Sequence, residues 1–422
     1  MKIYYRIVSL KKIFINFSFR SLANLFSKAL GLIALPIITR ALGPEAYGNY
    51  NLIILIAQYT FLPVGLLGLS SYGIRELAAD RKPDTYANDI LSMQFTVAVL
   101  SIFASSAITF IFFHNNFFLY NSILLGYFIV FSNAFNLEFF FVARKDLVFP
   151  TLARLLGQGI YIIGVILFIK DPMDIPVLIL LGALTPTIAD IIQLKKFRSL
   201  TGRIQIEFCP KKTLMTFKKT YKLGITANLE SFASSIPQIL IPIFLSSYAL
   251  GIFSGGFKIY SILAMFYSTL FYALAPYLVE LNNYPAKKRQ KYHLAIMGVI
   301  FFGSIVIGLS LFFLGEPLVE LILGKSFGES TYVFKVISLT LVPLMPVMMM
   351  IGSILIYAGN EGYYLIALLF QTIITAIASP IFLKIFGVVG GVYAMACSLL
   401  IGIIVGGYFY FIINMKEIKT RV

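Results

Sequence analysis

Three polar residues recur every four positions in an apolar run near the amino terminus. Arg20, Asn24 and Lys28 are spaced i, i+4 and i+8, which places them on one face of a helix. A cation inside hydrocarbon costs about 2.5–3.5 kcal/mol, so such a side chain normally faces protein or a water-filled cavity. Arginine matches two phosphate oxygens at once, and a low dielectric strengthens the attraction. The stripe therefore predicts a site for an anionic group, with snorkelling of Arg20 or Lys28 to the membrane interface as the alternative.

A second polar stripe lies about two hundred residues further along the chain. It has the same four-residue spacing and consists of Thr226, Glu230, Ser234 and Gln238. Glu230 is the only acid in this stripe. A buried carboxyl group can exchange a proton, and an ionised one can bind a cation, so Glu230 is the candidate ion-coupling residue. The alternative is a structural ion pair between Glu230 and Lys28 or Lys258.

The remaining charged residues give weaker signals. Lys258 follows two glycines near the outer start of an expected helix, where it can line a cavity or reach the external interface. We expect solvation at cytoplasmic helix ends to account for Glu138, Asp190 and Glu280. No catalytic constellation is present, and the two histidines lack Cys or acidic partners at metal-ligand spacing. We therefore expect a protein that is not an enzyme and has no metal, with H⁺ or Na⁺ as the coupling ion.

The elements that position these residues must be membrane helices. Of 422 residues, 59% are hydrophobic and only 12% are charged, a balance that a soluble domain cannot sustain. A spanning helix needs about 20 apolar residues. Twelve segments qualify, which predicts an all-α integral membrane protein, with spans at 13–38, 47–69, 90–113, 117–142, 149–169, 175–194, 223–246, 254–281, 292–314, 333–357, 363–386 and 391–414.

Lys and Arg are distributed very unevenly between the two sets of loops. One set, which includes both termini, carries 26 of the 34 Lys and Arg residues. Positive loops stay in the cytoplasm, so both termini are expected there. The net charge of +16 therefore reflects topology, and we expect no nucleic-acid partner. The predicted domains are two six-helix lobes at 1–194 and 223–422, joined by a basic cytoplasmic linker at 195–222.

The two halves resemble each other in sequence. Ala41-Leu42-Gly43 is followed by Gly48, and Ala249-Leu250-Gly251 is followed by Gly256 with the same spacing, an offset of 208 residues. Upstream, Ala23-Asn24-Leu25 matches Ala227-Asn228-Leu229, and Pro36 matches Pro242. Six helices separate the halves, so both cross the membrane in the same direction, as in parallel repeats that enclose a central cavity.

Two runs in the first ninety residues are distinctive: NLFSKALGLIALPIITRALGPEAYGNYNL, from Asn24 to Leu52, and SYGIRELAADRKP, from Ser71 to Pro83. They resemble the opening helices of the Wzx-type polysaccharide-biosynthesis flippases, which belong to the multidrug/oligosaccharidyl-lipid/polysaccharide exporter superfamily. The resemblance implies alternating-access flipping of undecaprenyl-pyrophosphate-linked oligosaccharide repeat units, for O-antigen or capsule, across the inner (cytoplasmic) membrane of a bacterium. It thus implies an anionic lipid-linked oligosaccharide, membrane lipids and other polysaccharide assembly proteins as partners. The candidate substrate-binding residues are then Arg20, Asn24, Lys28 and Lys258.

Three alternatives remain open at this point. A multidrug or metabolite exporter of the same superfamily would share the architecture, but its cavity would be expected to be acidic. A flippase for the peptidoglycan lipid precursor usually has fourteen helices. A membrane-embedded glycan polymerase or ligase, which belongs to a different class, typically presents a large external loop, and no such loop is expected here.

Overall fold

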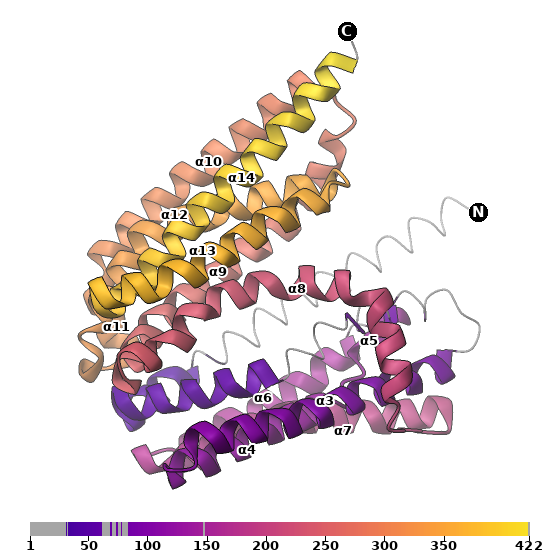
Figure 1. The fold of residues 1–422 in the computed structure, drawn as a ribbon, viewed down its shortest axis with the longest axis vertical. Coiled ribbons are helices and arrows are strands. Elements are labelled where there is room, and N and C mark those ends of the chain that lie inside the picture. The colour runs from indigo at the N-terminus through magenta and orange to yellow at the C-terminus, as the bar shows by residue number, and fades with distance from the viewer. Residues whose placement is uncertain are drawn as a thin grey trace. The chain divides into compact units, whose positions relative to one another are not determined.

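The computed structural model describes residues 31–420 except 32, 61–67, 70–72, 75, 76, 78–82 and 147, and for Glu230 and several other helical residues it describes the backbone alone. The described part is all-α, as expected (Figure 1). Residues 33–60 are helical. The following elements are α3 (Pro83–Phe113), α4 (Phe117–Asn133), α5 (Glu138–Ala143), α6 (Val148–Phe168), η1 (Pro172–Asp174), α7 (Ile175–Thr201), α8 (Pro210–Phe244), α9 (Ser247–Leu281), α10 (Ala286–Phe313), α11 (Gly315–Leu323), η2 (Lys325–Phe327), α12 (Ser330–Tyr357), α13 (Glu361–Phe386), η3 (Gly387–Val389) and α14 (Gly390–Thr420).

The helices are long and apolar enough to cross a bilayer. Each of the ten expected spans from 90 to 414 overlaps one of these helices, whereas the first two expected spans are described only in part. By length and composition, eight stretches of the described chain qualify as membrane spans, with α13 and α14 counted together. Large apolar side chains point outward, such as Phe103, which is 81% exposed. These faces suit contact with lipid, so the chain is a multi-pass membrane protein.

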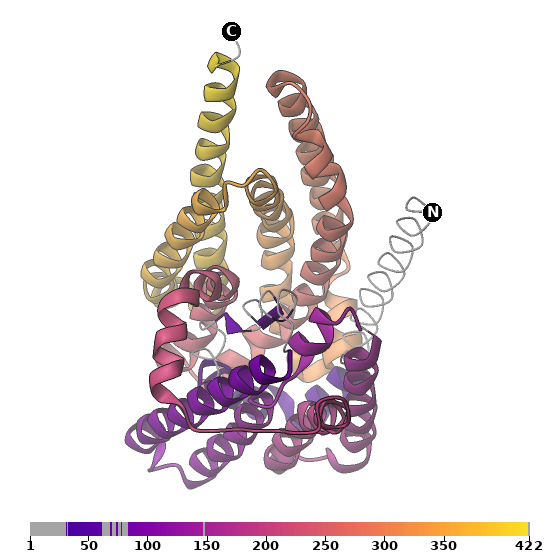
Figure 2. The same cartoon turned by 90° about the vertical axis from the view of Figure 1, so that its right-hand side faces the viewer.

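The described residues divide into two units, one with residues up to 42 and 53–228 and the other with 43–52 and 229–422. In the second unit α12, α13 and α14 lie side by side in both views (Figure 2). Residues 43–52 belong to this unit through close contacts. Buried Tyr47 packs edge-on against Phe327 of η2, with ring centroids 5.7 Å apart.

Two glycines in the second unit lie where two helical stretches approach backbone to backbone. The residues around Gly48 are helical, with a positive φ of 68° at Gly43, and α9 starts at Ser247. A Cβ added to Gly48 would lie 1.8 Å from the Ser247 carbonyl oxygen, and one added to Gly251 would lie 1.8 Å from the Pro44 carbonyl oxygen. Each glycine therefore lies directly against the backbone of the other stretch. The register of the internal repeat, which matches Gly43 with Gly251, stays a prediction.

The basic connection between the halves is mostly helical in the structure. α7 continues to Thr201 and α8 begins at Pro210, so only residues 202–209 are non-helical, visible as the thin pink stretch in Figure 2. Three backbone N–H groups of this stretch donate to side-chain oxygens of α3: Gln205 to Asn88 (3.1 Å), Glu207 to Ser92 (3.0 Å) and Cys209 to Thr96 (2.9 Å). The acceptors on α3 are four residues apart, whereas the donors in the extended stretch are two residues apart. The two spacings match in length, because four helical residues and two extended residues both rise by roughly 6–7 Å.

The glycine contact predicts a sharp difference between two glycine substitutions. Gly251→Ala places a methyl group against the Pro44 carbonyl, and overpacking of this kind costs about 1–3 kcal/mol. Gly298→Ala in α10 is the matched control, because nothing lies within 4 Å of the added Cβ. Thermal unfolding of the purified protein in detergent should show a clear loss of stability for Gly251→Ala alone. Equal stability of the two variants would contradict the contact.

Candidate functional site

A cavity of about 250 Å³ lies inside the second unit. Five helices contribute to its wall, α8, α9, α12, α13 and α14. Its polar lining consists of Ser231, Ser234, Tyr260, Ser261, Gln371, Thr375 and Ser398. Met345 also contributes, and its sulfur accepts the Tyr260 hydroxyl at 2.7 Å. The cavity is therefore polar on several sides, although the surrounding helices are apolar.

Four hydroxyl groups of the cavity, those of Ser234, Ser261, Thr375 and Ser398, donate to carbonyl oxygens of their own helices. Ser234 donates to the Ser231 carbonyl (2.9 Å), and Thr375 donates to the Gln371 carbonyl (2.8 Å). Such hydroxyls keep lone pairs free. Gln371 adds a buried Oε1 that has no hydrogen-bond partner among the described residues. The cavity thus offers acceptor oxygens, which suit a cation, a proton donor or water.

The polar stripe expected at Thr226, Glu230, Ser234 and Gln238 lies on α8. Ser234 lines the cavity, and the Gln238 amide donates to the Ser234 carbonyl at 3.5 Å. The side chains of Thr226 and Glu230 are outside the described part of the structure. In sequence, Glu230 directly precedes Ser231, which lines the cavity. Its ion-coupling role stays a prediction.

Lys258 lies on α9 one helical turn before a cavity residue. Ser261 lines the cavity and donates its hydroxyl to the Lys258 carbonyl oxygen at 2.7 Å. The Lys258 side chain itself is exposed. The other candidate substrate-binding residues, Arg20, Asn24 and Lys28, lie outside the described residues. A common binding site formed by Arg20, Lys28 and Lys258 stays a prediction.

A second polar cluster, not anticipated from the sequence, lies in the first unit. Asp190 of α7 is 3% exposed, so the expectation that solvation accounts for it is wrong. The Gln193 amide donates to Asp190 Oδ1 at 3.5 Å. Arg154 of α6 forms an ion pair with Glu138 at the start of α5. Solvation at a helix end does fit Glu280, which is exposed near the end of α9.

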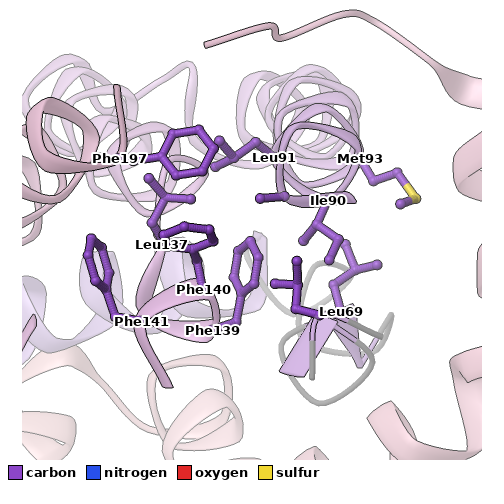
Figure 3. Packing of buried hydrophobic residues seen from close by; sticks show 11 residues of the cluster. Leu69, Ile90, Leu91, Met93, Leu137, Phe139, Phe140, Phe141 and Phe197 are labelled. Atoms are coloured by element: carbon purple, nitrogen blue, oxygen red, sulfur yellow. The ribbon is translucent and has the colours of Figure 1, made fainter. Parts of the chain in front are cut away.

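An aromatic core positions Glu138. The side chains of Phe139, Phe140 and Phe141 on α5 are at most 2% exposed and pack against residues of α3 and α7 (Figure 3). Phe140 meets Phe197 of α7 edge-on, with ring centroids 4.8 Å apart. Since α5 is only six residues long, this burial is what anchors it. The core therefore holds Glu138 beside α6.

His293 is buried on α10, where its Nδ1 lies 3.2 Å from the Tyr410 hydroxyl. Arg289, one turn earlier, donates to Asn414 of α14 at 2.9 Å. These contacts tie α10 to α14. Within the described residues, no group of three His, Cys, Asp or Glu side chains is arranged to hold a metal ion.

Comparison with known proteins decides the family. The family model described as "Polysaccharide biosynthesis protein" matches residues 13–282, more than half of the chain. The chain belongs to the polysaccharide biosynthesis protein family. It is also 25% identical over 417 residues to the capsular polysaccharide biosynthesis protein CapF of Staphylococcus aureus, covering 94% of this chain and 98% of CapF.

Solved structures show that members of the MOP transporter superfamily share the fold. A multidrug resistance MATE family transporter in an inward-facing conformation aligns with a TM-score of 0.69 at 15% identity, covering 94% of this chain and 96% of the transporter. The lipid II flippase MurJ in an inward closed conformation aligns with a TM-score of 0.67 at 16% identity, covering 95% and 90% of the two chains. This family member therefore shares the all-α fold of these membrane proteins, as the sequence indicated.

Proposed function

We propose that the protein is a flippase for undecaprenyl-pyrophosphate-linked oligosaccharide repeat units of a capsular or O-antigen polysaccharide. It moves them from the cytoplasmic to the outer face of the inner membrane by alternating access, with both termini in the cytoplasm. The observation that carries the proposal is the match to CapF over nearly the whole of both chains, combined with a transporter fold. A polysaccharide-biosynthesis chain with the fold of a transporter is best explained by moving a biosynthetic intermediate.

The charges in the membrane segments favour an anionic cargo. Within the expected spans six cations outnumber four acids; the cations are Arg20, Lys28, Arg154, Lys258, Lys335 and Lys384, and the acids are Glu138, Asp190, Glu230 and Glu280. Fixed cations attract a pyrophosphate group strongly where the dielectric is low. A cavity for cationic drugs would be expected to carry the opposite sign, so the charges argue against the multidrug exporter reading in spite of the shared fold.

The alternative from another class is a membrane-embedded glycan polymerase or ligase, which would be an enzyme. The fold argues against it, because the solved structures of similar fold are transporters and a flippase. The described chain has no long non-helical segment after Pro83, where the longest one, residues 202–209, is docked on α3. We infer that the protein is not an enzyme.

Deletion of the gene should leave lipid-linked repeat units on the cytoplasmic face of the inner membrane. The measurement is protection of these units from an externally added glycosidase in spheroplasts, with the intact gene restoring access. Units that accumulate on the outer face would instead indicate a polymerase or ligase and would contradict the proposal.

Removal of a candidate cation should weaken transport of the anionic head group. A hydrogen bond to a charged group contributes about 1.5–3 kcal/mol, so Lys28→Ala and Lys258→Ala should each lower flipping by roughly tenfold or more at equal protein level. Lys325→Ala is the matched control. The Lys325 side chain is 90% exposed, and its ammonium group is already paired with the Glu320 carboxylate at 3.6 Å. Undiminished flipping by either variant removes that lysine from the mechanism.

Glu230 is proposed to couple an ion to the transport cycle. Gln keeps the shape of Glu but cannot ionise, so Glu230→Gln should abolish the dependence of flipping on pH or on sodium, measured in vesicles with imposed gradients. Glu280→Gln, at the exposed end of α9, is the control. If Glu230→Gln responds to both gradients like the unmodified protein, Glu230 serves only a structural ion pair.

A further inference from the structure

The buried pair Asp190 and Gln193 has two oxygens left without partners. The two residues are 3% and 2% exposed, respectively, and lie one turn apart on α7. The Gln193 amide nitrogen donates to Asp190 Oδ1. Asp190 Oδ2 and Gln193 Oε1 are both fully buried and have no hydrogen-bond partner among the described residues. Two unsatisfied acceptors in one buried cluster require explanation, because each costs free energy.

The nearby charges do not explain these oxygens. Arg154 of α6 is paired with Glu138 of α5, and Lys196, further along α7, is paired with Asp146 at 3.2 Å. Arg154 and Glu138 are the charged groups that act on Asp190 electrostatically. α4, which also packs on α7, has no charged residue in its sequence. Within the described residues Asp190 therefore forms no ion pair of its own.

A proton on Asp190 resolves the unsatisfied acceptors. It converts Oδ2 from an acceptor into an O–H donor, and Gln193 Oε1 is an acceptor in need of a donor. A carboxylic acid and a primary amide can form two hydrogen bonds at once, amide N–H to one carboxyl oxygen and carboxyl O–H to the amide oxygen. The contact at 3.5 Å is half of such a pair. A neutral acid also avoids burying an unpaired negative charge.

A metal cation explains the arrangement less well. A sodium ion is normally surrounded by several oxygens, and this cluster offers only two that lack partners in the described part of the chain. The guanidinium group of Arg154 would also repel a cation held at Asp190. The proton needs a single acceptor and adds no charge beyond neutralising the carboxylate.

We propose that Asp190 and Gln193 form a proton-binding site in the first unit, with Asp190 held as a neutral acid. Release breaks the Oδ2–H bond and passes the proton to water when the cluster opens. The carboxylate left behind then competes with Glu138 for Arg154, so release changes the contacts between α5, α6 and α7. Proton binding stands on the geometry alone, whereas a part in the transport cycle rests on the proposed function.

Infrared difference spectroscopy of the full-length protein in liposomes tests the site without any substrate. The unmodified protein should show the C=O stretch of a protonated carboxylic acid at neutral pH, and Asp190→Asn should lose that band. Asp171→Asn is the matched control, since Asp171 is exposed and the chemical change is identical. A difference spectrum, unmodified protein minus Asp190→Asn, that contains no carboxylic C=O band overturns the proposal.

A second variant keeps the test decisive if Asp190→Asn does not fold. Gln193→Leu removes the amide partner and leaves the acid, so the carboxyl band should remain and move to higher frequency. An unchanged band frequency in Gln193→Leu would show that the protonated group is elsewhere. These spectra are independent of flipping, so failure of the proton site and failure of the flippase function give different results.

Discussion

Every backbone polar group that lies in hydrocarbon must find its partner inside the protein, and this constraint governs the rest of the structure. Helices satisfy it along their length, which is why the described chain is all-α. The same constraint acts on side chains. Hydroxyls of the spans donate to the carbonyl one turn earlier, as Thr187 does to Ala183 (2.7 Å) and Ser379 to Thr375 (2.6 Å). Gln371, Asp190 and Gln193 differ, because each has a buried side-chain oxygen without a hydrogen-bond partner among the described residues.

Breaks in the helices occur where another group takes over the backbone hydrogen bonds. The Ser246 hydroxyl accepts from the Ala249 N–H (3.1 Å) at the start of α9, and the Asn116 side chain accepts from the Leu119 N–H (3.0 Å) at the start of α4. Small residues, Gly48 and Gly251, allow the start of α9 and the helical residues around Pro44 to approach backbone to backbone.

Hydropathy predicts the spans well because hydrocarbon thickness sets a minimum helix length, but it cannot say where a helix stops once it leaves the lipid. The expected end of one span at Leu194 lies seven residues before the real end of α7 at Thr201, so the hydropathy pattern places Asp190 near a solvated helix end although it is buried. The Ser234 face of the cavity was predictable from its four-residue spacing. Gln371 was not, since only packing brings α13 beside α8.

The division between acceptors and donors has a consequence for how charge crosses the membrane. Interiors that are rich in acceptor oxygens can hold a proton or a cation but would repel a pyrophosphate. The anionic head group of the proposed cargo needs donors instead, and the proposed donor Lys258, an exposed residue, lies one turn from a cavity residue on α9. The proposed cation and anion sites therefore call for different surfaces of the same helices. Because α9 carries both Lys258 and cavity residues, a shift of this helix is the simplest way for the two proposed sites to be coupled.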